Sequence, residues 1–293
     1  MKIGIDIGGS HIGMALVDNK GKIVEKIEED IISDKKEIKN FLKEYISKNL
    51  NYFIKKEKQI DLIGIAAPGK SNGNRIQNLV NLGIKEMDFS VILDKYNIPY
   101  QIKNDSKAAA IAEERYGALQ NYKDSVFLCI GTGIGSGVFL NKKLLKANIN
   151  PGFELGHMVI EKNGLNCKCG KKGCFETYCS IKRFKDNIKN ILEKQNLDSK
   201  QLLKILEEVC LSQREKNAIK IVENDELVKI ENGKVIITKE KIIKVREVVE
   251  QYINDLLIGL SNVIDIFEPE AICFGGSFVY FKNIFYERLV NEM

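Results

Sequence analysis

One loop limits what this chain can fold into more than any other stretch. Residues 150–176 read N-P-G-F-E-L-G-H-M-V-I-E-K-N-G-L-N-C-K-C-G-K-K-G-C-F-E and hold one of the two histidines and three of the seven cysteines. Three thiolates and one imidazole in a short segment are the donor set of a closed, four-coordinate zinc site. We therefore predict a structural Zn²⁺ site that orders the loop, with His157, Cys167, Cys169 and Cys174 as its ligands. The alternative is a loop with ordinary reduced thiols.

Composition sets the class of protein. The chain has 293 residues, of which 44% are hydrophobic and 29% charged, as expected for a soluble protein of about two domains. The net charge of +5 gives little support to a nucleic-acid or membrane partner. No apolar run is long enough to span a bilayer, and Met1-Lys2 leads into an expected strand without the layout of a signal peptide. We expect a cytoplasmic protein with neither kind of partner.

Glycine-rich turns follow apolar strands at the start of each half of the chain. The first comes after the expected strand 2–7 and contains Asp6, Gly8, Gly9 and Ser10. Its backbone N–H groups are suited to a phosphate and Asp6 to a hydrated Mg²⁺, although a plain hairpin has the same pattern. The second turn, G-T-G-I-G-S-G at 131–137, follows the strand 125–130 and is the stronger anion signal. Together the two turns predict a clamp for a polyphosphate.

A third glycine pair follows the last expected strand, 270–274. Gly275 and Gly276 are suited to the close approach of a flat base or its ribose.

Asp105 is the candidate catalytic carboxylate. It follows the expected strand 98–102 and precedes the alanine-rich helix 107–115, a place that faces a cleft in many α/β proteins. Asp105 is equally suited to cap that helix.

Upstream, the asparagine-rich stretch 73–82 is expected to form a polar loop. The amides of its Asn78 and Asn81 match the hydrogen-bonding needs of sugar hydroxyls. The alternative is a plain turn, where asparagine is equally common.

Helical and turn patterns account for most of the remainder. Asp34 is a candidate cap for an amphipathic helix, and Asn232-Gly233 predicts a hairpin within 227–238. Apolar residues at helical spacing predict further helices over 181–190, 200–210 and 239–267.

Together these motifs resemble the ROK family of bacterial sugar kinases and related repressors, in the actin-like, hexokinase-like ATPase superfamily. The resemblance rests on the order of D-I-G-G-S, A-P-G, N-D, G-T-G-I-G-S-G, E-L-G-H, C-x-C-G-x-x-G-C-x-E and F-G-G-S along the chain. It implies an α/β fold with two actin-like (ribonuclease H-like) domains around a cleft, each with a mixed central sheet flanked by helices. We place the domains at 1–117 and 118–293.

The resemblance also implies roles for individual residues. Asp105 matches the general base, and the zinc ligand His157 also matches a sugar contact. Gly69, Asn81 and Asn104 match other sugar-side residues. Glu154 and Glu176, like His157, match positions that contact the sugar or order the loop. The positions that match Mg-ATP-side residues are Asp6, Gly8, Gly9, Ser10, Gly131, Thr132, Gly133, Gly275 and Gly276.

The implied activity is ATP-dependent phosphorylation of a hexose at its 6-hydroxyl, with a glucokinase as the first hypothesis. The alternatives are a kinase for mannose, fructose, allose or an N-acetylhexosamine, and a sugar sensor of the repressor branch, which usually carries an additional N-terminal helix-turn-helix. The family also implies a homodimer. Three features depart from its pattern: His11 replaces a usual lysine, Ile84 replaces a usual aromatic residue, and the usual last strand and helix are not found before Met293.

Overall fold

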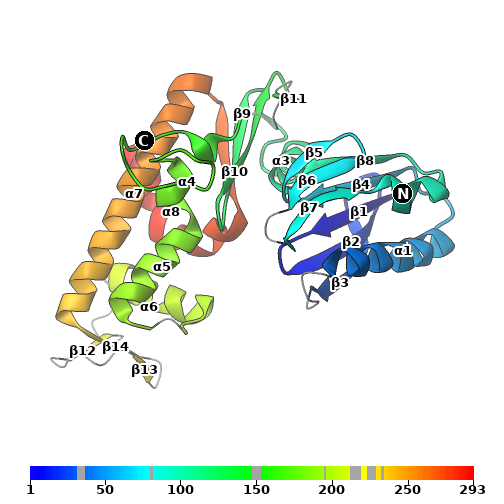
Figure 1. Cartoon of the computed structure of the whole chain (residues 1–293). Coiled ribbons are helices and arrows are strands. Elements are labelled where there is room, and N and C mark those ends of the chain that lie inside the picture. The colour runs from blue at the N-terminus through cyan, green and yellow to red at the C-terminus, as the bar shows by residue number, and fades with distance from the viewer. Residues whose placement is uncertain are drawn as a thin grey trace. The chain divides into compact units, whose positions relative to one another are not determined.

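The structure, a computed structural model, describes residues 1–31, 37–79, 82–146, 153–194, 196–211, 219–222, 229–231 and 234–293 (Figure 1). Its contacts group the chain into two compact units. Unit 1 comprises Met1–Lys123 and Gly137–Phe153, and unit 2 comprises Asp124–Ser136 and Glu154–Met293. The division into domains at residue 117 stays a prediction.

Unit 1 is built on a five-stranded mixed sheet. In the order of the sheet its strands are β3 (Ile23–Asp30), β2 (His11–Val17), β1 (Lys2–Ile7), β4 (Leu62–Ala67) and β8 (Tyr100–Asn104). β1 pairs antiparallel with β2 and parallel with β4, and β4 pairs parallel with β8. The three parallel strands therefore end at the same edge of the sheet.

The core of unit 1 lies between this sheet and α1 (Ile38–Lys56). Alternate residues of β1, among them Ile3 and Ile5, are buried together with Leu42, Ile46 and Phe53 of the helix. The period of two in the strand and of three to four in the helix produces these apolar faces. The predicted cap Asp34 lies outside the described residues.

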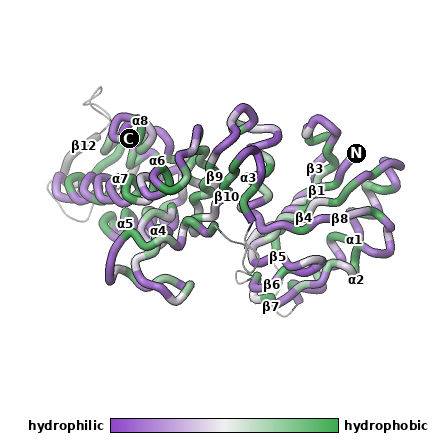
Figure 2. Tube along the Cα trace, turned by 90° about the horizontal axis from the view of Figure 1, so that it is seen from above, coloured by the Kyte–Doolittle hydropathy of each residue, from purple (hydrophilic) through white to green (hydrophobic). Residues whose placement is uncertain are grey.

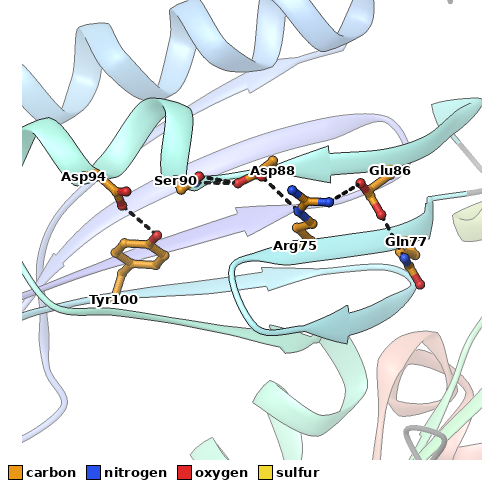
Figure 3. Close-up of polar contacts among 7 residues, drawn as sticks. All are labelled: Arg75, Gln77, Glu86, Asp88, Ser90, Asp94 and Tyr100. Carbon is orange, nitrogen blue, oxygen red and sulfur yellow. Dashed lines mark hydrogen bonds and ion pairs between the residues drawn. The ribbon is translucent and has the colours of Figure 1, made fainter.

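The prediction of a polar loop at 73–82 is wrong. A small antiparallel sheet of β5 (Lys70–Asn72), β6 (Arg75–Leu79) and β7 (Ile84–Asp88) occupies this region. Figure 3 shows the polar pairs across β6 and β7: Arg75 Nε lies 2.9 Å from Asp88 Oδ2, and Gln77 Nε2 donates to Glu86 at 2.8 Å. Gly73 and Asn74 keep their turn conformation between β5 and β6, whereas the residues from Arg75 on pair with β7.

Unit 2 packs helices against β9 (Ser125–Ile130) and β15 (Ala271–Gly275), which are parallel neighbours. Its longest helix, α7 (Lys239–Phe267), has the predicted bounds and begins where the Thr238 side chain accepts from Lys241 N at 3.2 Å. Green and purple segments alternate along α7 in Figure 2, as expected for a helix with one buried face. The other long helices are α5 (Ile181–Leu192), α6 (Ser199–Leu211) and α8 (Lys282–Glu292).

Aromatic rings fill the space between these helices. Phe184 of α5, Tyr252 of α7 and Phe285 of α8 have ring centroids 4.7 to 5.1 Å apart. The hairpin predicted within 227–238 is confirmed by β13 (Lys229–Glu231) and β14 (Lys234–Thr238), which also pairs with β12 (Ile219–Val222). Its turn residues Asn232 and Gly233 lie outside the described residues.

The architecture is the predicted mixed α/β fold, with sheets flanked by helices. Within the described ranges, no helix is both long enough and apolar enough to cross a lipid bilayer.

Candidate functional site

The predicted metal ligands form a cluster in unit 2. His157 is the last residue of the short 3-10 helix η3 (Leu155–His157), and Cys174 directly precedes α4 (Phe175–Cys179). The ligand atoms of the cluster all lie within 4.8 Å of one another, and Cys169 Sγ and Cys174 Sγ are 3.6 Å apart. At a zinc–sulfur bond of about 2.3 Å, ligand atoms of a tetrahedral site lie about 3.8 Å apart. The residues His157, Cys167, Cys169 and Cys174 therefore fit a four-coordinate metal ion.

Backbone bonds fold the cysteine-bearing part of this loop into a compact hairpin. Cys167 N donates to Lys171 O at 2.8 Å, and Gly173 N donates to Leu165 O at 2.8 Å. A further bond from Phe175 N to Met158 O, also 2.8 Å long, holds the start of α4 beside the residue that follows His157. The backbone thus brings residues from both ends of the loop to the same cluster.

The three thiols differ in their electrostatic surroundings. Burial raises the pKa of the Cys167 thiol to about 12 and raises the pKa of Cys174 above its ordinary value. The backbone N–H of Lys171 lowers the pKa of the more exposed Cys169. A divalent metal must therefore displace protons from at least two of the thiols at neutral pH.

Glu176, predicted as a sugar contact or loop-ordering residue, lies against this cluster. Its Oε1 is 3.5 Å from His157 Nδ1 and 3.3 Å from Cys167 Sγ. Its Oε2 accepts from Ile134 N at 3.4 Å. One carboxylate therefore touches both the metal cluster and the strand that follows the second glycine turn.

In unit 1, the structure places Asp105 at the beginning of α3 (Asp105–Tyr116). The capping residue is its neighbour Asn104, whose Oδ1 accepts from the backbone N of Ser106 and Lys107. Asn104 Nδ2 also donates to Gly69 O at 3.1 Å, which joins two predicted sugar-side residues. Asp105 Oδ1 accepts from Ser106 N at 2.7 Å. The cap role that competed with catalysis for Asp105 is thus filled mainly by Asn104.

Asp6 lies in β1, at the same sheet edge as Asn104 and Asp105. The turn behind it, with Gly8, Gly9 and Ser10, is closed by a bond from Gly8 N to His11 O at 2.8 Å. Partial desolvation raises the pKa of the Asp6 carboxyl; His11 lowers it and the charge of Asp105 raises it. His11 Nε2 is 3.9 Å from Asp6 Oδ2, and 64% of the Asp6 side chain is exposed. Water therefore weakens these interactions, but the carboxylates of Asp6 and Asp105 are close enough to influence each other electrostatically.

The second glycine turn of the chain lies in unit 2. It joins β9 to β10 (Ile134–Leu140) and contains Gly131, Thr132 and Gly133. It is closed by a bond from Gly131 N to Gly133 O at 2.9 Å, and Lys182 N donates to Gly131 O at 3.1 Å. Because β9 and β15 are parallel neighbours, Gly275 and Gly276 at the end of β15 lie beside the end of β9. The structure thus brings together the predicted phosphate-side and adenosine-side residues of unit 2.

Two further predicted sugar-side residues are Asn81 and Glu154. Asn81 lies outside the described residues, and Glu154 directly precedes η3. Ser136, which the sequence counts with the anion-binding residues of the second turn, is fully buried, and its Oγ accepts from Leu155 N at 3.1 Å. The sequence does not predict this contact with Leu155, because the two residues lie 19 positions apart.

Two curated proteins illustrate what this chain resembles in sequence. The chain is 28% identical over 297 residues to a xylose repressor from Bacillus spizizenii, an alignment that covers 94% of this chain and 64% of the repressor. It is 32% identical over 186 residues to a glucokinase from Halalkalibacterium halodurans, covering 61% of this chain and 56% of the glucokinase. The chain therefore spans less than two thirds of the length of these curated relatives.

Solved structures share the fold. The structure of a ROK hexokinase from Thermus thermophilus matches this chain with a TM-score of 0.72 and 21% identity. The match covers 99% of this chain and 86% of the hexokinase chain. This likeness confirms the predicted actin-like α/β architecture. The sequence model of the ROK family matches residues 2–293. With a match over nearly its whole length, the chain belongs to the ROK family.

Proposed function

We propose that the chain is an ATP-dependent sugar kinase that phosphorylates a hexose at its 6-hydroxyl, with glucose as the first candidate. The observation that supports this most is the placement of Asp105 at the carboxyl end of β8, beside a capping Asn104 and near Asp6. In this proposal Asp105 accepts the hydroxyl proton as the phosphoryl group is transferred. General-base catalysis of this kind contributes roughly 10²–10⁴-fold in rate.

The remaining residues have binding roles in the proposal. Asp6 and the turn of Gly8, Gly9 and Ser10 would hold Mg²⁺ and phosphate, and the second turn with Gly275 and Gly276 would hold the nucleotide. Magnesium would supply charge neutralisation when bound. Asn104, Gly69, Asn81, Glu154, His157 and Glu176 would contact the sugar or order the loop around it. Zn²⁺ would be structural, because a four-ligand site has no open position.

Relatives of known function support the proposal in part. A ROK glucokinase from Streptomyces griseus was solved in complex with glucose and AMPPNP. It is 22% identical to this chain with a TM-score of 0.69, and the match covers 99% of this chain and 87% of the glucokinase chain.

We further propose a cytoplasmic homodimer with neither membrane nor nucleic acid as partner.

The second candidate is a sugar-responsive regulator without kinase activity. The observation that favours it is the 94% coverage of this chain by the alignment with a xylose repressor. A regulator of this kind would bind its sugar without consuming ATP, and DNA would then be a partner.

The two candidates are separated by a coupled assay for ADP release with Mg-ATP. The panel contains glucose, mannose, fructose, allose, N-acetylhexosamines and xylose, and the largest kcat/KM identifies the substrate. Asp105→Asn should lower kcat by about 10²–10⁴-fold while sugar binding stays measurable by calorimetry. Sugar binding without ADP release by the unaltered, zinc-loaded protein would support the regulator instead. An unchanged kcat in Asp105→Asn would remove Asp105 from its assigned role.

A further inference from the structure

Within unit 2, two independent supports connect the metal loop to residues 131–136 of the glycine turn. The first runs through α4, which begins directly after the candidate ligand Cys174. Glu176 in the first turn of α4 accepts from Ile134 N with its Oε2 at 3.4 Å, while its Oε1 lies against His157 and Cys167. The position of this carboxylate is therefore tied to the position of three candidate ligands.

The second support runs through η3, which ends in the candidate ligand His157. Leu155 N donates to the buried Ser136 Oγ at 3.1 Å. Gly156 lies so close to the carbonyl of Ile134 that a Cβ on it would overlap the backbone. His157 and Cys174 thus adjoin the two elements that contact Ile134 and Ser136 of β10.

The turn is closed by the bond from Gly131 N to Gly133 O, and its glycines have no side chains that could add contacts. It contains four glycines, and a Cβ on Gly133 would lie 2.6 Å from Glu176 Oε2, so the carboxylate fills the space where a side chain would stand. Glycine-rich backbone loses much conformational entropy when it is ordered, and contacts from outside must offset that loss. Glu176 supplies such a contact at the last turn residue before the strand.

We propose that Glu176 is a positioning residue through which the metal loop fixes the conformation of the turn 131–137. A metal that joins His157 to the cysteines holds η3 and α4 together, and these elements hold Ile134 and Ser136. Loss of the metal or of the Glu176 carboxylate would loosen the turn and expose the Ile134 amide. The inference rests on the proposed function only for its consequence, which is that a loosened turn binds the phosphates of a nucleotide more weakly.

The experiment compares wild-type protein with Glu176→Ala, Glu176→Gln and Glu161→Ala, each zinc-loaded and chelator-treated. Glu161 is an exposed carboxylate of the same loop and serves as the matched control. Two readouts are taken without sugar: amide hydrogen exchange of residues 131–137, with α7 as internal reference, and the Kd of a fluorescent ATP analogue. Zinc content of each sample is measured alongside.

Chelation of the wild type and the Glu176→Ala substitution should each speed exchange at the Ile134 amide about tenfold, the size expected for one lost hydrogen bond. The Kd of the analogue should rise by a similar factor. Glu176→Gln should recover part of both effects because its amide oxygen still accepts from Ile134 N. Glu161→Ala should change neither readout.

Unchanged exchange at 131–137 after chelation, or an effect of Glu161→Ala as large as that of Glu176→Ala, would overturn the inference. If no sample binds the analogue but exchange at 131–137 still responds to zinc and to Glu176→Ala, the coupling stands and the nucleotide part of the proposed function fails. The two failures are thereby distinguished.

Discussion

Gly259 lies in the middle of α7 and faces the ring of Phe175, the first residue of α4. A Cβ built on Gly259 would lie less than 3.0 Å from three ring atoms of Phe175, whose side chain is fully buried. Two effects therefore oppose each other in Gly259→Ala. Alanine favours the helix by about 1 kcal/mol. Overpacking a buried contact costs about 1–3 kcal/mol.

Steric overlap should prevail because the Phe175 ring has no route to solvent and Gly259 is held within a regular helix. Taking the upper half of the overpacking range, we expect a net loss of about 1–2 kcal/mol in the free energy of unfolding. For a unit of about 150 residues this corresponds to a Tm lower by roughly 2–8 °C.

The measurement is thermal unfolding followed by circular dichroism on zinc-loaded protein. Ser261→Ala, an exposed position of the same helix, is the matched control and should leave Tm unchanged or raise it slightly. Adding Phe175→Leu to Gly259→Ala should cost less than the sum of the two single substitutions, because the smaller side chain relieves the overlap. A Gly259→Ala variant that is more stable than wild type would refute the reasoning.

Two further predictions concern unit 2. Burial raises the pKa of Cys167 to about 12 and also raises the pKa of Cys174, so both thiols are protonated between pH 6 and 8. The apparent zinc affinity should therefore fall by at least about 100-fold per unit of decreasing pH, measured by competition with a chelating dye. A pH-independent affinity would show that neither thiol binds the metal. Tyr252→Phe should lower the free energy of unfolding by about 1–2 kcal/mol, because the buried Tyr252 hydroxyl donates to Cys179 O at 2.9 Å. The measurement is unfolding in urea. The control Tyr286→Phe, at an exposed position, should change the free energy of unfolding by less than about 0.5 kcal/mol.

Elements with a complete local pattern were predictable from the sequence. The strand 2–7 and the helix 239–267 have their predicted bounds, because an alternating strand and a capped amphipathic helix need no distant partner to be recognised. The wrong prediction at 73–82 concerns a strand whose pairing with 84–88 and burial of Ile76 and Leu79 depend on tertiary packing.

The candidate site shows the same limit. The spacing of Cys167, Cys169 and Cys174 with an upstream His157 predicted a cluster that the structure brings together. The contact between Glu176 and Ile134 joins residues 42 positions apart, so no short pattern contains it. Likewise, the choice between Asn104 and Asp105 as helix cap depends on backbone angles that neighbouring residue types leave open.

Strand β10 belongs partly to each unit, since the boundary falls between Ser136 and Gly137. Unit 1 is therefore discontinuous in the chain, and a ribosome must synthesise residue 153 before all of its segments exist. The first residues of unit 2 emerge earlier than the last segment of unit 1, so unit 1 must complete its fold with residues 124–136 inserted between its two segments. An isolated fragment that ends near residue 120 would lack the segment in which Gly137 packs against Ala110. A gene for unit 1 alone would need 137–153 joined to 1–123 by a designed linker.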